Sequence, residues 1–182
     1  LIHDRDDIFI STKYFPSSRF QSGALEKSFS ESMQRLQRTS VDLFWIHKPN
    51  HLLENLQEAI PLIKDGRIRS IGTSNVSLEH IKQAEQLLAK EGLKLGAVQN
   101  HFSLLRNDQQ PIIDYCNSRG IRYYAYMVLE QGALAGRYDA QHHFPTFSMR
   151  NFAFPKSKFK KIERLLSMMR DLAEKYDIDR SQ

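Results

Sequence analysis

Short apolar runs recur along the chain, and each run ends at a polar or aromatic side chain. The five runs cover residues 8–12, 41–46, 68–73, 96–98 and 121–125, and they lead into Lys13, His47, Ser74-Asn75, Gln99-Asn100 and Tyr126, respectively. Successive run ends lie 25 to 34 residues apart, which is the length of one strand and one helix. Runs of this kind are typical of parallel strands covered on both faces.

Between the runs the apolar positions change to helical spacing. The expected helices use Leu25, Phe29, Met33 and Leu36; Leu53, Leu56, Ile60 and Ile63; Ile81, Ala84 and Leu88; the segment around Ile112; and Phe159, Ile162, Leu166, Met169, Ala173 and Tyr176. Each set places apolar side chains on one helical face. The sequence therefore predicts helices that pack against the strands.

Residues that begin or end helices stand at the margins of these segments. Ser77 is expected to cap the helix over residues 78–90, Asn107 or Asp108 to cap the next, and Ser157 to open the last. Gly66, Gly92 and Gly120 are expected to end helices. Pro61 is expected to kink or interrupt its helix.

The alternation of strands and helices predicts an α/β fold with a parallel sheet. We expect an incomplete (β/α)8 TIM barrel of about five units, in one partial domain over residues 1–182. In such barrels the chemistry gathers at the carboxyl ends of the strands, where the five runs end. Residues 138–156 are irregular and form either a pocket-covering loop or a long connection.

Composition narrows the classes of function. The net charge of +5 comes without the basic and aromatic stripe that nucleic-acid binding requires, so we expect no nucleic-acid partner. No apolar stretch is long enough for a membrane span. A lone cysteine, Cys116, favours a reducing, cytoplasmic location and is interpreted as buried filler. Of the histidines only His47 ends a strand, and His142-His143 lacks a nearby third ligand, so no metal site is expected.

The residues at the run ends resemble the aldo-keto reductases, which are NADPH-linked carbonyl reductases on (β/α)8 barrels. The matching segments are residues 11–13, 41–47, 66–75, 98–100 and 125–126. The most specific is Gly-Arg-Ile-Arg-Ser-Ile-Gly-Thr-Ser-Asn at 66–75. The resemblance implies reduction of a small aldehyde or ketone to an alcohol with NADPH; NADH stays open as the cofactor, and so does the carbonyl substrate.

The resemblance also implies roles for single residues. Lys13 would lower the pKa of a catalytic tyrosine, and His47 would orient and polarise the carbonyl group. Ser74, Asn75 and Gln99 would hold the nicotinamide carboxamide, and Tyr126 would stack on the nicotinamide ring. Each residue taken singly has an ordinary structural explanation, whereas their gathering at one sheet edge favours function.

A loop after the fifth strand resembles the family loop that wraps the cofactor pyrophosphate. Its candidate contacts are Met127, Leu129, Gln131 and Gly132. Met127 replaces a hydroxyl residue, and Glu130 adds a negative charge. Residues 154–157 resemble the family segment that binds the 2′-phosphate of NADPH. They follow the fifth strand, however, whereas the family segment follows the last strand of the barrel. We interpret them as a capped basic helix start.

Two catalytic residues of the family pattern have no counterpart. Twelve residues before Lys13 are too few for the strands that carry the family's aspartate and tyrosine, and Tyr14 should face away from Lys13. We therefore expect an incomplete chain that is inactive alone and prone to self-association, with an unknown native oligomeric state. One alternative is a non-catalytic cofactor-binding or regulatory module on the same fold. Another is an unrelated barrel, such as a metal-dependent hydrolase.

Overall fold

A computed structural model describes residues 5 and 7–181, which form two compact units. The first unit runs to His101 and includes Asp108–Tyr126; the second comprises Phe102–Asn107 and the chain from Met127 onward. No helix among the described residues is long and apolar enough to cross a membrane.

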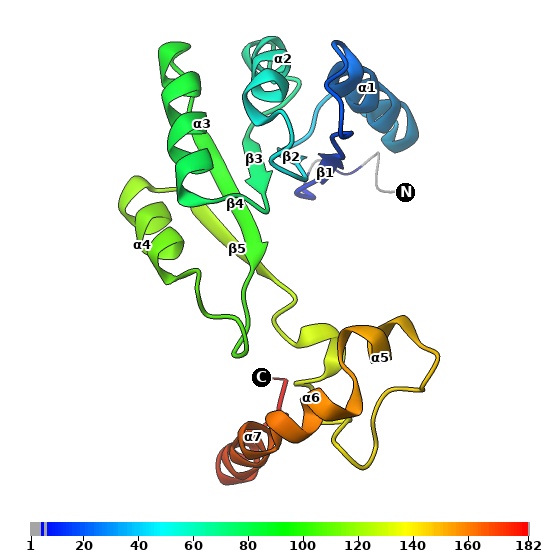
Figure 1. Ribbon diagram of the computed structural model, residues 1–182. Helices are drawn as coiled ribbons and strands as arrows, with labels where there is room; N and C mark the ends of the chain where they lie inside the picture. The colour runs from blue at the N-terminus through cyan, green and yellow to red at the C-terminus, as the bar shows by residue number, and fades with distance from the viewer. Residues whose placement is uncertain (1–4, 6, 182) are drawn as a thin grey trace. The chain divides into compact units, whose positions relative to one another are not determined.

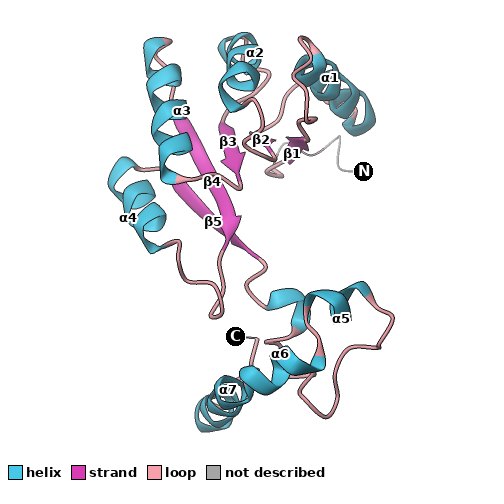
Figure 2. Cartoon of the chain, in the orientation of Figure 1, coloured by secondary structure: helices cyan, strands magenta, loops and turns pink. Residues whose placement is uncertain are grey.

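Five parallel strands form the sheet of the first unit, in chain order (Figure 1). They are β1 (Ser11–Tyr14), β2 (Leu43–Ile46), β3 (Ile71–Ser74), β4 (Leu95–His101) and β5 (Arg122–Tyr126). The helices between them are α1 (Ala24–Leu36), α2 (Leu52–Lys64), α3 (Leu78–Lys90) and α4 (Gln110–Arg119). Figure 2 shows these helices alternating with the strands. The predicted α/β order and partial barrel are confirmed.

The helices bury one face of the sheet. Phe44 of β2 meets Phe29 of α1 edge to face, with ring centroids 5.4 Å apart. Ile46, Leu56 and Ile81 are fully buried in the same core. Burying each such side chain contributes about 1.5–3 kcal/mol. This core holds the strands in place, and loops follow the carboxyl ends of the strands.

The opposite face of the sheet carries a smaller apolar cluster of Leu43, Trp45 and Ala97, with Tyr124 against it. The rings of Trp45 and Tyr124 meet edge to face at 5.4 Å. Gly72 of β3 lies beside Trp45, where a Cβ atom would lie only 2.6 Å from Cε3 of the indole. Glycine at this position therefore makes room for the tryptophan.

Replacing Gly72 by alanine is expected to lower the free energy of unfolding by about 1–3 kcal/mol, because the added methyl group overlaps the Trp45 ring. Urea unfolding of the two chains measures the difference. In a Trp45→Leu background the same substitution should cost less, because leucine lacks the six-membered ring that the methyl group meets. Equal costs in both backgrounds would contradict this explanation.

The second helix departs from its predicted form. Pro61 lies inside α2 without interrupting it, and Asp65 N still donates to Pro61 O at 2.9 Å. The predicted buried face is also partly wrong, because Leu53 is exposed. The buried positions are Leu52, Asn55, Leu56, Ala59 and Leu62. Packing of this face on both sides of the proline holds the last turn in helical form.

Helix ends were predicted with mixed success. Ser77 caps α3, as predicted, with its Oγ accepting from His80 N at 3.3 Å. Gly66, Gly92 and Gly120 follow the ends of α2, α3 and α4 with positive φ, also as predicted. The cap predicted for α4 at Asn107 or Asp108 is wrong, because the N-cap is Gln109. A hydrogen bond of 2.8 Å from Asn100 Nδ2 to Gln109 Oε1 ties this helix start to β4.

The second unit packs around Phe144, Phe154, Phe159 and Leu166. It contains the short helix η2 (Glu130–Gly132), α5 (Met149–Ala153), α6 (Lys156–Lys161) and α7 (Glu163–Tyr176). Because Phe144 and Phe154 come from the irregular segment 138–156, that segment contributes to a core.

The single last helix predicted from apolar spacing is instead two helices. The chain leaves helical geometry at Ile162, with φ −104° and ψ 9°. Pro155 rather than Ser157 stands at the N-cap of α6, and it provides no side-chain cap. Phe159 packs against Phe144 and Phe154, and Tyr176 is exposed. The helix start predicted at residues 154–157 is confirmed, but its side-chain cap is not.

Candidate active site

The strand register brings the predicted residues of the first unit to one edge of the sheet. Lys13 pairs with Trp45, Ser74 with Gln99, and His101 with Tyr126. Lys13 Nζ donates to Gln99 Oε1 and lies 5.4 Å from the centre of the Trp45 ring. The ends of β1 and β4 are thus linked by side chains.

Asn75 connects the ends of three other elements. Its Nδ2 donates to His47 O at 2.9 Å and to Ser74 Oγ at 3.2 Å. Its Oδ1 accepts from Tyr126 OH at 2.5 Å. The backbone of Asn75 is left-handed, with φ 60°, a conformation that asparagine tolerates better than most residues. One side chain therefore joins the loop after β2, the end of β3 and the end of β5.

The backbone near Asn75 is held by two buried polar residues. Ser74 is buried, and its Oγ donates to Gln99 O at 2.8 Å. Asn100 lies on the helix-covered face, accepts from Val76 N at 3.0 Å and donates to Val76 O at 2.8 Å. The sequence interpretation assigned no role to Asn100. A polar residue at an inward position of an otherwise apolar strand is the signal that could have found it.

The pKa values of Lys13 and His47 are both lowered from their ordinary values. Burial lowers the pKa of Lys13. Burial also lowers the pKa of His47 below its ordinary value of 6.5, and the positive charges of Lys13 and Lys48 lower it further. A neutral imidazole can donate one hydrogen bond to a substrate oxygen.

The imidazole of His47 is expected to titrate below pH 6.5 in an NMR titration, because the charged form is disfavoured in the folded chain. Since the unfolded chain then binds the proton more readily, His47 lowers folding stability as pH falls below 6.5. Replacing Lys13 by methionine removes one positive charge and should move the midpoint upward. A midpoint above 6.5 in the unmodified chain would contradict this view of the site.

Tyr14 follows Lys13 but belongs to the helix-covered core, where its side chain is buried. Burial raises the pKa of its hydroxyl, and the charge of Glu58 raises it further. The prediction that Tyr14 faces away from Lys13 is confirmed. Tyr14 is therefore excluded as a proton donor at this edge.

The predicted pyrophosphate-loop residues belong to the second unit. Met127, Gln131 and Gly132 have positive φ values of 58°, 57° and 100°, so this loop takes tight turns. Glu130 accepts a hydrogen bond from Ser103 Oγ within the same unit. Leu129 packs against the apolar core of that unit. These loop residues therefore belong to a different unit from the residues at the sheet edge.

No cluster of three or more potential metal ligands occurs in the described residues. Cys116 is a buried free cysteine, and burial raises the pKa of its thiol to about 11. A thiol of this kind is a poor nucleophile.

A family model described as the aldo/keto reductase family matches residues 2–182. The chain belongs to the aldo/keto reductase family. Its lysine, histidine, Ser-Asn pair and glutamine at the strand ends are the positions that carried the resemblance in the sequence.

Several curated proteins are similar in sequence to most of this aldo/keto reductase chain. An uncharacterized oxidoreductase of Mycobacterium tuberculosis is 27% identical over 183 residues, which is 98% of this chain and 55% of that protein. Glyoxal reductase of Bacillus subtilis is 33% identical over 132 residues, 71% of this chain and 46% of the relative. The chain spans about half the length of the relatives it matches.

Solved structures show the same fold. The glycerol dehydrogenase AKR11B4 from Gluconobacter oxydans superposes with a TM-score of 0.74 at 26% identity, over 90% of this chain and 50% of that one. A Gox0644 mutant in complex with NADPH superposes with a TM-score of 0.68 at 20% identity, over 98% and 55% of the two chains.

Proposed function

We propose that the complete protein reduces an aldehyde or ketone to an alcohol with NADPH. The observation that carries this proposal is the linkage of Lys13, His47, Ser74, Asn75 and Gln99 at the carboxyl edge of one parallel sheet. Membership in the aldo/keto reductase family supports it. The substrate is then a small carbonyl compound, and the lone buried cysteine suits a reducing compartment such as the cytoplasm.

The residues at this edge suit a nicotinamide carboxamide, which has two donor hydrogens and one acceptor oxygen. Ser74, Asn75 and Gln99 offer a hydroxyl and two amides on adjacent strand ends, and each amide both donates and accepts. Tyr126 lies 5.5 Å from the His101 ring and offers an aromatic face nearby. A solved structure of the same fold is an NADPH complex. The pyrophosphate would be taken by Met127, Leu129, Gln131 and Gly132.

NADPH, when bound, supplies the hydride that adds to the carbonyl carbon. The chain must then orient the carbonyl and help deliver a proton to its oxygen. Neutral His47 would donate a hydrogen bond to that oxygen and fix its direction. The Lys13 ammonium would stabilise the ionised form of a hydroxyl proton donor beside it, which lowers the pKa of that donor.

Titration of NADPH into the chain, followed by the fluorescence of Trp45, tests cofactor binding. Trp45 is the only tryptophan, and its ring lies next to Lys13. Saturable quenching is expected. The matched test of activity is NADPH oxidation by the complete protein with a panel of aldehydes and ketones. Quenching without turnover of any carbonyl compound would favour a non-catalytic cofactor-binding module instead.

A further inference from the structure

An aromatic side chain and a lysine stand beside His47 without an assigned role. Phe15, directly after β1, is 57% exposed, and its ring meets the His47 ring edge to face at 5.1 Å. Lys48 Nζ lies over the same Phe15 ring, 4.4 Å from its centre. Phe15 thus contacts both the imidazole proposed to orient the carbonyl group and an ammonium group. Such cation–π contacts hold a lysine in place while its charge stays available.

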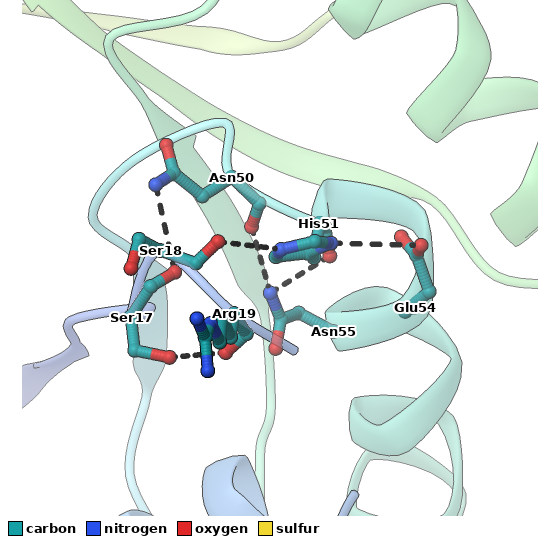
Figure 3. A network of polar contacts seen from close by, with 7 residues as sticks. All are labelled: Ser17, Ser18, Arg19, Asn50, His51, Glu54 and Asn55. Carbon is teal, nitrogen blue, oxygen red and sulfur yellow. Dashed lines mark hydrogen bonds and ion pairs between the residues drawn. The ribbon is translucent and has the colours of Figure 1, made fainter. Parts of the chain in front are cut away.

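The two loops that carry Phe15 and Lys48 are fastened together by polar contacts (Figure 3). His51 Nε2 lies 3.2 Å from Ser18 O, and Asn50 Nδ2 lies 3.5 Å from Ser17 O. Asn55 Nδ2 donates to Asn50 O at 3.0 Å and to His51 O at 2.7 Å, which anchors the second loop to α2. These contacts hold together the two loops that carry Phe15 and Lys48.

The two loops around Lys48 contain no acidic residue, and the first carboxylate after the second loop, Glu54 of α2, lies 3.8 Å from His51 Nδ1. No acidic residue occurs from Ile8 to Leu25 or from Leu43 to Leu53. In the described part of the chain, Lys48 makes no ion pair with a carboxylate. An ammonium without a protein counter-ion beside a hydrogen-bonding imidazole suits an anionic ligand.

We propose that Lys48, seated on Phe15 beside His47, selects carbonyl substrates that carry a carboxylate a few bonds from the carbonyl group. This specificity rests on the proposed function of the same edge. The carbonyl oxygen would lie at His47, the carboxylate at Lys48, and the connecting carbons against Phe15. In this arrangement Lys48, on the loop after β2, contacts the substrate, whereas Ser74 of β3 and Gln99 of β4 hold the nicotinamide.

The test compares succinic semialdehyde with butanal, in which a methyl group replaces the carboxylate. In the complete protein, Lys48→Met is expected to lower the ratio of kcat/KM for the two aldehydes about tenfold, mainly through KM for succinic semialdehyde. Lys48→Arg should keep most of the ratio. The matched control is Lys82→Met, because Lys82 also lies over an aromatic ring, Tyr115 at 5.7 Å, on the helical side of the unit.

Each other outcome is decisive. An unchanged ratio in Lys48→Met, or a drop in NADPH affinity equal to the drop in succinic semialdehyde kcat/KM, would overturn the assignment of Lys48 while the reductase function stood. If the unmodified protein reduced other carbonyl compounds of the panel but not succinic semialdehyde, the proposed preference for carboxylates would fail. If it reduced no compound of the panel, the proposed function would fail. Succinate binding, followed by the NMR shift of the Phe15 amide, would then decide the role of Lys48. Binding that is lost in Lys48→Met supports the role, and binding that is unaffected excludes it.

Discussion

Replacing Lys13 by methionine is expected to lower kcat of the complete protein by a factor of about 10²–10⁴, the range that a positioned acid–base group contributes. Methionine keeps the length and the apolar stem of the side chain but removes the ammonium group that hydrogen bonds to Gln99. Without that charge, the hydroxyl proton donor proposed to lie beside Lys13 in the complete protein would lose its lowered pKa. Steady-state NADPH oxidation with a saturating aldehyde measures the effect.

Affinity for NADPH separates this role from a structural one. Lys13 contacts Gln99 at the sheet edge, but its loss leaves the bonds of Ser74 and Asn75 in place. The dissociation constant for NADPH should therefore change only a few-fold. Lys27→Met, at an exposed position of α1, is the matched control and should retain full turnover. Near-normal kcat in Lys13→Met would contradict the catalytic assignment.

The edge of the sheet could be predicted from the sequence because two regular features coincide there. Each apolar run predicts a strand that other elements cover, and parallel strands place their carboxyl ends at the same edge of the sheet. Lys13, Ser74 and Gln99 were therefore predicted to lie together, and the register confirms it. The spacing of the runs did not indicate the roles of these residues. Those roles came from the resemblance to the aldo-keto reductases, which is most specific at residues 66–75.

Contacts between segments far apart in the chain could not be predicted from the sequence. The N-cap residue of α4 is Gln109, whose side chain accepts a hydrogen bond from Asn100 of β4 rather than capping the helix. The usual N-cap preference for asparagine and aspartate favoured Asn107 or Asp108 in the sequence. The division of the last helix at Ile162 has a similar origin, because Phe159 packs into a core with Phe144 and Phe154 that apolar spacing does not reveal.

The Phe15 and Lys48 pair was missed for the same reason. The chain places them 33 positions apart, on loops after different strands, and neither belongs to a recognised segment. Their proximity follows from the pairing of β1 with β2 and from the bonds between the two loops. Because Lys48 lies in a loop rather than at the end of a strand, the pattern of apolar runs gave no signal for it.

Replacing Asn75 by alanine is expected to weaken NADPH binding by about ten- to a hundredfold. The side chain donates hydrogen bonds to His47 O and Ser74 Oγ and accepts one from Tyr126 OH, so its loss loosens two neighbours in the proposed nicotinamide site and the backbone of His47. Alanine also tolerates the φ of 60° less well than asparagine, which lets the backbone relax away from Gln99 O. Titration of NADPH against Trp45 fluorescence measures the loss.

Two further variants make the result specific to the hydrogen-bond network. Tyr126→Phe removes only the hydroxyl bonded to Asn75 and should weaken NADPH binding less than Asn75→Ala, because the aromatic face remains. Asn117→Ala changes an exposed asparagine of α4 and should leave the affinity as it was. If Asn75→Ala bound NADPH as tightly as the unmodified chain, the nicotinamide carboxamide could not lie between Ser74, Asn75 and Gln99. The cofactor would then have to approach the sheet edge elsewhere, and the role of His47 beside it would change as well.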